Sequence, residues 1–402
     1  MKTDYDIIII GNGMVGASLA NALATLDLRI AIIDKTPLNQ SKTPSGKLDG
    51  RKIALSLGSY KILQQIGIWP YLTTAATMIK QVHVSQKNKF GAVLINAADM
   101  NAATLGYVVA AEAFNQAFYS ALKDNTKIEW LCPAILQNIE LATPANVTIS
   151  QHGQEKKLTA KLIVAADGAL SYSRQLLNIA VKEKDYQQTA LVSSVQLTQP
   201  HHHIAYQRLT NDAVIAMLPM QKKTYGVVYT APKQYIEQLL IHDDDTLLKQ
   251  LQQQFGYRLG RLEKLGPRFT YPIKLIIATE QVKPNFLLLG NAAHNLSPIA
   301  AQGFNLALQD IYCLSHLIQR YGDDYDFILS QYQQQRQQEQ QDIIAFTDRL
   351  MTWSKANIPL LKTFALLLLD LNPNMKQSFA RLGMGLTPQL QSLIRDGDAQ
   401  RL

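Results

Sequence analysis

The fold of this chain is decided by residues 5–34, YDIIIIGNGMVGASLANALATLDLRIAIID. A short run of β-branched residues, Tyr5 to Ile10, leads directly into a glycine-rich turn, and the alanine and leucine positions after it suit a helix packed on a sheet. A second apolar run then ends at Asp34. This order predicts a strand, a helix and a second strand, which together are the βαβ unit that binds dinucleotides.

The turn has the spacing GxGxxG, with Gly11, Gly13 and Gly16 at the three fixed positions. The first glycine allows the tight turn, the second lets a pyrophosphate approach the backbone, and the third lets helix and strand pack closely. The helix N-terminus offers free N–H groups and a positive dipole to the phosphates. We expect Asp34 to accept hydrogen bonds from the ribose. The other residues of this unit expected to contact the cofactor are Met14, Val15 and Lys35.

The composition limits the classes of protein to consider. The chain has 402 residues, of which 47% are hydrophobic and 17% charged, so it is globular and longer than one common domain of about 100–150 residues. Its two cysteines, Cys132 and Cys313, form no disulfide or zinc pattern, so we expect a reducing compartment and no metal site. The formal net charge of +8 is compatible with nucleic acid, an anionic membrane or an acidic ligand.

Neither end of the chain indicates a membrane span. The N-terminal apolar run is too short for a signal peptide. The longest apolar stretch, residues 358–371, is interrupted by Lys362 and is shorter than the roughly 20 residues that a span needs. We therefore expect a cytoplasmic protein that is at most peripheral on the inner face of the membrane.

Periodicity predicts the remaining elements. Alternating apolar and polar residues over 78–99 and 189–271 indicate the strands of a half-exposed antiparallel sheet. Helices are expected over residues 53–66 and 304–321, and the glutamine-rich stretch 331–342 is expected to be a solvated helix.

Three later segments indicate which dinucleotide is bound. DGRKIALSLGSYKILQQIGIW, LIVAADGALSYSRQLL and FLLLGNAAHNLSPIAAQGFNLALQD resemble the fingerprints of the FAD-dependent aromatic hydroxylases, the group that includes para-hydroxybenzoate hydroxylase. Within that group the chain most resembles the ubiquinone-biosynthesis hydroxylases. The motifs that carry the resemblance lie at residues 7–34, 49–69, 162–177 and 286–310.

The resemblance implies an α/β fold: a Rossmann-like (GR2-type) FAD-binding domain with an inserted mixed or antiparallel-sheet substrate domain and a helical C-terminal tail. The expected divisions are residues 1–77, 100–180 and 272–350 for the discontinuous FAD-binding domain, 78–99 and 181–271 for the substrate domain, and 351–402 for the tail.

The resemblance also assigns roles near the cofactor. Arg51 would lie near the flavin, where a fixed cation stabilises negative charge on the reduced ring. Asp167 and Gly168 match the pair that approaches the FAD pyrophosphate, and Arg174 would hold their loop in place. Gly290 and Asn291 match a Gly-Asp pair whose acid contacts the ribityl chain, and the amide here can still hydrogen-bond a hydroxyl.

The loop before the late helix would surround the isoalloxazine ring. Pro298 would line the site where oxygen reacts, and together with Arg51 it is the residue expected to act in catalysis. The helix N-terminus would face the pyrimidine edge of the flavin, through Gln302, Gly303, Phe304 and Asn305. Two positions depart from the family pattern, since Ala301 replaces a usual glycine and Ala110 a usual polar residue.

The implied function is that of an FAD-dependent monooxygenase that hydroxylates the aromatic ring of a polyprenylated phenol in ubiquinone biosynthesis. In such a hydroxylase, reduced flavin and molecular oxygen form a C4a-hydroperoxide, so no protein nucleophile is needed. Only one nucleotide fingerprint is present, so NAD(P)H would bind only transiently, or another donor would supply the electrons.

Several alternatives remain open at this point. One is a catalytically weakened flavin-binding scaffold subunit of a quinone-biosynthesis complex. The apolar tail with interspersed lysines, from Trp353 to Leu386, could lie on an anionic membrane, pack on another quinone-biosynthesis protein, or form a core helix. A homo-oligomer is also open. No nucleic acid is expected, because no clustered Lys/Arg helix or aromatic platform is present. His294 is expected to pack in the flavin loop, and residues 201–203, three histidines, to form a turn.

Overall fold

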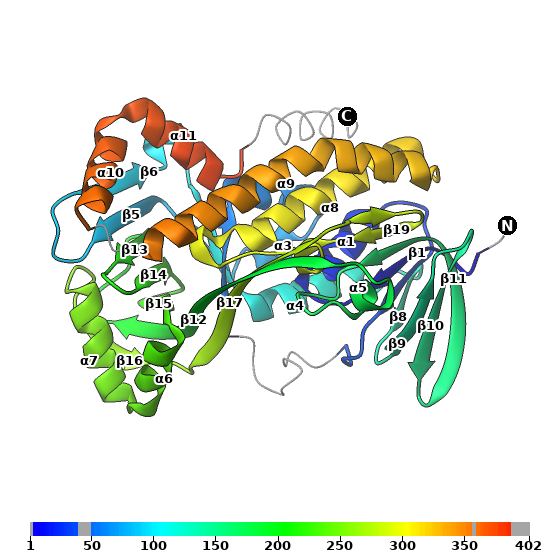
Figure 1. The fold of residues 1–402 in the computed structure, drawn as a ribbon, viewed down its shortest axis with the longest axis horizontal. Coiled ribbons are helices and arrows are strands. Elements are labelled where there is room, and N and C mark those ends of the chain that lie inside the picture. Colours follow the sequence, from blue (N-terminus) through cyan, green and yellow to red (C-terminus); the bar gives the residue numbers. More distant parts are fainter. Residues whose placement is uncertain (1–2, 39–49, 356–358, 387–402) are drawn as a thin grey trace.

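A computed structural model describes residues 3–38, 50–355 and 359–386 (Figure 1). These residues form two large sheets and one small sheet. The long helices α8 (Gln302–Tyr321) and α9 (Tyr325–Lys355) lie side by side and contribute to the cores beside both large sheets. The expected α/β fold with a parallel sheet, an antiparallel sheet and C-terminal helices is confirmed.

The first sheet has the strand order β18-β19-β11-β1-β2-β8, with β9 and β10 as an antiparallel extension of β11. Its strands are β1 (Tyr5–Ile10), β2 (Ile30–Ile33), β8 (Ile128–Leu131), β9 (Ile135–Glu140), β10 (Ala145–Gln151), β11 (Gln154–Ala165), β18 (Val282–Lys283) and β19 (Phe286–Leu288). Strand β1 runs parallel to both β2 and β11. Helices α1 (Met14–Leu23), α4 (Ala111–Leu122) and α8 cover one face, and β9 and β10 curl over the other. Because both faces are covered, the isoleucines of β1 are buried, which explains the uninterrupted apolar run.

The second sheet has the order β20-β17-β12-β15-β14-β13-β5-β6, with β16 beside β12. Its strands are β5 (Gln81–Gln86), β6 (Ala92–Asn96), β12 (Val181–Leu197), β13 (Ile204–Leu209), β14 (Val214–Pro219), β15 (Thr224–Pro232), β16 (Leu262–Leu265), β17 (Phe269–Ala278) and β20 (His294–Asn295). Adjacent strands are antiparallel except β5 and β13, which are parallel. Helices α6 (Lys233–Ile241) and α7 (Asp244–Phe255) cover one face, and part of the other face packs on α8 and α9.

A small third sheet has the strand order β3-β7-β4. The remaining elements are β3 (Lys52–Ser56), α2 (Leu57–Gln65), α3 (Trp69–Leu72), β4 (Thr77–Ile79), β7 (Gly106–Ala110) and α5 (Tyr172–Leu176), with short 3₁₀ turns η1 (Ala98–Met100), η2 (Gly290–Ala292) and η3 (Ile299–Ala301).

Two secondary-structure predictions were wrong in part. The helix expected over residues 53–66 begins as strand β3, because Ile53, Ala54 and Leu55 pair with β7, and the Ser56 hydroxyl then accepts from the Ser59 N–H to cap α2. The span 189–271 contains α6 and α7 as well as strands. The α7 start carries a clear signal, since Asp243 caps it by accepting from the Thr246 N–H.

The glutamine-rich helix is also less solvated than expected. Tyr332, Arg336 and Gln340 of α9 are buried, and they lie one turn apart on the side that faces α8. The sequence does not predict this buried face, because its residues are mostly polar and therefore give no hydrophobic periodicity.

Helices α10 (Pro359–Leu371) and α11 (Pro373–Gly383) pack beside β5 and β6 through Leu366 and Ala380, and Met384, directly after α11, belongs to the same cluster. The tail therefore contributes to a core cluster on one side. Among the described residues, no helix is both long and apolar enough to cross a membrane. The part of the expected tail over residues 387–402, like the loop at 39–49, lies outside the described residues.

Candidate functional site

The glycine turn lies at the carboxyl ends of the parallel strands, between β1 and α1. Gly11 has a φ of +105°, and a Cβ there would lie 2.6 Å from the carbonyl oxygen of Ala166. A Cβ on Gly16 would overlap the carbonyl oxygen of Gly11. By contrast, no atom lies within 4 Å of a Cβ built on Gly13, and no side chain caps the N-terminus of α1. This open space beside free helix N–H groups suits a pyrophosphate.

Asp34 stabilises the same turn from the end of β2. Its Oδ2 accepts from the N–H of Asn12 at 2.7 Å, and its Oδ1 accepts from the N–H of Thr36 at 2.7 Å. Each carboxylate oxygen keeps a second lone pair, so a ribose hydroxyl can still donate to it. Lys35 is exposed beside it.

A second loop follows β11 at the same edge of the sheet. Asp167 accepts from the N–H of Ser173 through Oδ2 at 2.9 Å, whereas its Oδ1 is buried without a hydrogen-bond partner. Gly168 has a φ of +89° and open space where a Cβ would be. An unpartnered carboxylate oxygen beside an open glycine is consistent with a site for a donor group of the cofactor.

Arg174 of α5, directly after this loop, also connects it to the loop after β19. Its guanidinium donates to the carbonyl oxygens of Ala169 at 2.9 Å and Ala292 at 2.8 Å. In the second of these loops Gly290 has a φ of +61°, and a Cβ there would lie 2.8 Å from Val15. The side chain of Val15 thus fills the space that Gly290 leaves, and the partly buried Asn291 follows.

The N-terminus of α8 lies beside β3. Asn305 donates to the carbonyl oxygens of Ala54 at 3.0 Å and Ala301 at 2.6 Å, and it accepts from the N–H of Ser56 at 2.9 Å. The Asn305 side chain therefore holds β3 against the start of α8. The backbone N–H groups at this helix start are left for the expected contact with the flavin. Ala301, at the N-cap of α8, has a left-handed φ of +52°.

The other predicted residues differ in their exposure to solvent. Pro298 is exposed, Gln302 is buried, and Gly303 and Phe304 are partly buried. The carbonyl of Arg51 accepts from the N–H of Ala111 at 3.1 Å, which joins the start of β3 to the start of α4, directly after Ala110.

A buried ionic network behind this loop was not predicted. Asp310 of α8 is fully buried, and its Oδ1 accepts from Arg336 at 2.7 Å and from Gln340 at 3.0 Å. Its Oδ2 lies 3.1 Å from Nε2 of His294, which follows the η2 turn. Burial alone would raise the pKa of Asp310, but Arg336 and His294 outweigh it and hold the pKa below its ordinary value. The signal in the sequence is that Asp310 is the one acidic residue of α8.

Neither cysteine is suited to act as a nucleophile. Burial, as the main cause, raises the pKa of Cys132 to about 12 and that of Cys313 to about 12, so both remain thiols at neutral pH. The three histidines at 201–203 form a turn before β13, as expected. Within the described part of the chain, no group of three His, Cys, Asp or Glu residues could hold a metal.

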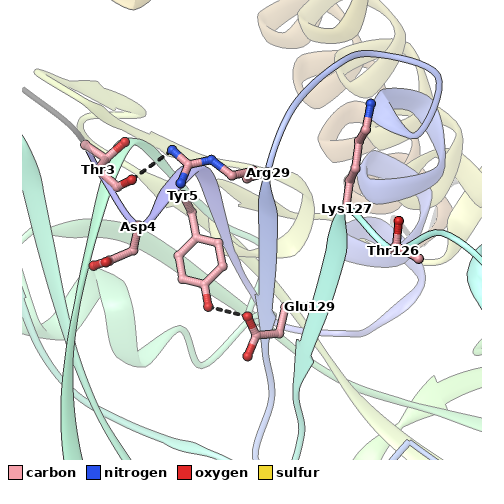
Figure 2. A pocket seen from close by; sticks show the side chains of 7 residues that line it. All are labelled: Thr3, Asp4, Tyr5, Arg29, Thr126, Lys127 and Glu129. Carbon is pink, nitrogen blue, oxygen red and sulfur yellow. Dashed lines mark hydrogen bonds between the residues drawn. The ribbon is translucent and has the colours of Figure 1, made fainter.

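A separate open pocket lies away from this site. It has a volume of about 590 Å³ and lies at the amino-terminal ends of β1, β2 and β8, at the opposite end of these strands from the glycine turn (Figure 2). Two of its side chains are already paired within the pocket, since Tyr5 donates to Glu129 at 2.6 Å and Arg29 donates to the carbonyl oxygen of Thr3 at 2.8 Å. This pocket is therefore not the candidate site.

Three loops at one sheet edge, an uncapped helix N-terminus with open space at Gly13, and the unpartnered Oδ1 of Asp167 fit an FAD molecule. Combined with the antiparallel sheet and the C-terminal helices, they define an FAD-dependent monooxygenase of the aromatic-hydroxylase class. Residues 4–347 match the FAD binding domain family, and the chain belongs to this family.

Similarity to individual proteins extends over most of the chain. It is 31% identical to "Uncharacterized protein slr1300" of Synechocystis, covering 97% of each chain. It is 28% identical to "Ubiquinone hydroxylase UbiL" of Rhodospirillum rubrum, covering 97% of this chain and 92% of the relative. Among solved structures, p-nitrophenol 4-monooxygenase PnpA from Pseudomonas putida has the same fold, with a TM-score of 0.78, 15% identity, and coverage of 96% of this chain and 99% of that one.

Proposed function

We propose that this protein hydroxylates the aromatic ring of a polyprenylated phenol in ubiquinone biosynthesis. The observation that supports this substrate class is the similarity to a ubiquinone hydroxylase over 97% of the chain. A second relative, the 3-demethoxyubiquinol 3-hydroxylase of Escherichia coli, is 28% identical over 82% of this chain. The product would be the phenol with one added hydroxyl group, and the second oxygen atom would leave as water.

In this proposal the two large sheets have different roles. The loops at the edge of the parallel sheet hold FAD, which when bound supplies the chemistry of oxygen activation. The glycine turn and α1 bind the pyrophosphate, Arg51 lies by the flavin ring, and Pro298 lines the reaction site. The second sheet holds the phenol ring and excludes water, which protects the reaction from unproductive release of peroxide. NAD(P)H or another donor binds transiently to deliver electrons.

A polyprenylated substrate partitions into lipid, and α10 offers a surface for reaching it. Phe364, Leu368 and Leu371 recur at helical spacing and are exposed, with Leu371 at 77%. We propose that this stripe lies on the inner face of the membrane, as a peripheral contact of the tail. Other quinone-biosynthesis proteins or a second copy of the chain are the alternative occupants.

The activity test uses the purified yellow holoprotein with NADPH or chemically reduced flavin, oxygen and a prenylated phenol. We expect mass spectrometry to detect a product one oxygen atom heavier, formed with matching NADPH oxidation. A protein that binds FAD normally but yields only hydrogen peroxide and no hydroxylated phenol would contradict the proposal and favour the scaffold subunit. In a strain lacking the gene, the quinone precursor that accumulates would identify the ring position, and normal quinone levels would exclude the pathway.

A further inference from the structure

A cluster of cationic side chains lies on the second sheet, outside the candidate site. His83 and Ser85 project from β5, and Arg208 projects from the neighbouring strand β13, where it pairs in register with Ser85. Arg258 reaches the same place from the loop after α7. Tyr206, beside His83 on this face, belongs to the core under α6 and α7, so the cluster faces away from α8, α9 and the proposed flavin site.

The two arginines are oriented by hydrogen bonds to neutral groups. Arg208 donates from Nη1 to the Ser85 hydroxyl at 3.1 Å, and Arg258 donates from Nη1 to Nε2 of His83 at 2.6 Å. Because Nε2 accepts this bond, the imidazole is neutral and carries its proton on Nδ1. That Nδ1 and the Nε of Arg208 are buried donors without acceptors. The cluster thus has a surplus of donors.

No carboxylate in the described part of the chain forms a salt bridge with either guanidinium. A third cation, Lys87, lies at the end of β5, where it donates to Gln254 of α7 at 2.8 Å. The C-terminus of α7 near Arg208 offers a partial negative charge of only about half an elementary unit. It cannot neutralise the cations around it.

The pKa values of Arg208 and His83 are both lowered in this cluster. Burial and then the charge of Arg258 lower the pKa of Arg208, and the same two causes lower the pKa of His83. Burial is the larger cause in both groups, and the nearby positive charge of Arg258 adds to it. A bound anion would offset this positive charge, because it supplies acceptors to the donors and charge to the guanidinium groups.

From this geometry we propose that Arg208 and Arg258, with His83 and Ser85 orienting them, form a binding site for a phosphate-type oxyanion on the outer face of the second sheet. Guanidinium groups match the oxygen spacing of phosphate through paired N–H donors. Arg258 is exposed and Arg208 is half-buried, so the anion can enter from solvent. The phosphate could belong to a small molecule or to a lipid headgroup, and the two are separated by experiment.

The test measures binding of inorganic phosphate to the FAD-loaded full-length protein by calorimetry, at constant ionic strength with chloride as the reference anion. We expect Arg208→Gln and Arg258→Gln each to weaken phosphate binding at least about tenfold, or roughly 1.4 kcal/mol. The matched control is Arg261→Gln, because Arg261 is an exposed arginine of the same loop and has no place in the cluster. The phosphate affinity of Arg261→Gln should equal that of the wild type. The flavin absorbance spectrum confirms that each variant is folded.

A second arm replaces phosphate with vesicles of phosphatidylglycerol or of phosphatidylcholine. Binding of free phosphate assigns the site to a small molecule. Flotation with phosphatidylglycerol vesicles that Arg208→Gln reduces and Arg261→Gln does not assigns the site to a lipid headgroup. The proposal is overturned if neither probe binds, or if the Arg208 and Arg258 variants bind as tightly as the control.

Discussion

Single residues decide where the cofactor can approach, and the three glycines of the first turn have different physical roles. Gly11 and Gly16 are required by close backbone contacts, whereas Gly13 has a normal φ of −74° and open space around it. The motif alone does not distinguish these positions. The structure shows that Gly11 and Gly16 are needed for backbone packing, whereas Gly13 leaves space for a ligand.

Gly13→Ala should therefore leave the apoprotein folded and weaken FAD binding at least about tenfold, because the added methyl group occupies space needed by the pyrophosphate. Fluorescence titration gives the affinity, and thermal melting of the apoprotein gives the stability. Gly16→Ala is the contrasting variant, and we expect it to destabilise the apoprotein itself. Equal FAD affinity in Gly13→Ala and wild type would show that the phosphates do not approach here.

Ala301 is the second residue with a specific conformational consequence. Its left-handed φ of +52° is unfavourable for a side chain with a Cβ, and glycine removes that cost. We expect Ala301→Gly to raise the free energy of unfolding by about 0.5–1 kcal/mol in urea titrations. Ala307→Gly, in the buried interior of α8, is the control and should lower it by about 1 kcal/mol. The same sign for both variants would contradict the strain argument.

At the scale of elements, the buried charges of α8 and α9 align the two long helices. Asp310→Asn would leave Arg336 buried without its main counter-charge, and such a change costs about 3–5 kcal/mol. Chemical denaturation of the apoprotein measures the loss. Asp342→Asn is a matched control, because Asp342 is exposed on α9. It should change the stability by less than about 0.5 kcal/mol.

The same carboxylate predicts a pH dependence with a definite sign. Since the pKa of Asp310 is lowered in the folded state, its stabilising contribution is complete above the unfolded value of about 3.9. That contribution is lost as the pH falls through the lower folded-state pKa. We expect unfolding free energies measured from about pH 6 downward to fall more steeply below about pH 4 in wild type than in Asp310→Asn. Parallel curves for the two proteins would show that the pKa of Asp310 is the same in the folded and the unfolded state.

At the scale of the whole molecule, the exposed stripe of α10 is the surface through which we propose that the protein reaches a lipid-soluble substrate. Replacing Leu368 and Leu371 together with glutamine removes apolar area from a proposed membrane contact, so flotation with anionic liposomes should fall several-fold. Turnover of a short-chain, water-soluble phenol should not change. Replacing the exposed Ile135 of β9 and Ile241 of α6 with glutamine is the control. Unchanged flotation of the α10 variant would exclude this surface as the contact.

The sequence by itself determined the nucleotide-binding unit, the α/β class and the order of the flavin loops. These features can be predicted from short segments such as residues 5–34, because the spacing of apolar residues, turn glycines and motif residues depends only on neighbours in the chain. The same local reasoning failed at residues 53–56, because pairing with β7 outweighed the helical pattern.

Only the tertiary structure decided what depends on contacts between distant residues. It showed that the Asn305 side chain holds β3, that Asp310 pairs with Arg336 and His294, and that Arg208 and Arg258 lie together on one sheet face, with no salt bridge to a carboxylate among the described residues. A buried charge or a cationic cluster produces no periodic signal, because its partners are set by strand order and helix packing. Those long-range arrangements are properties of the fold and not of any segment.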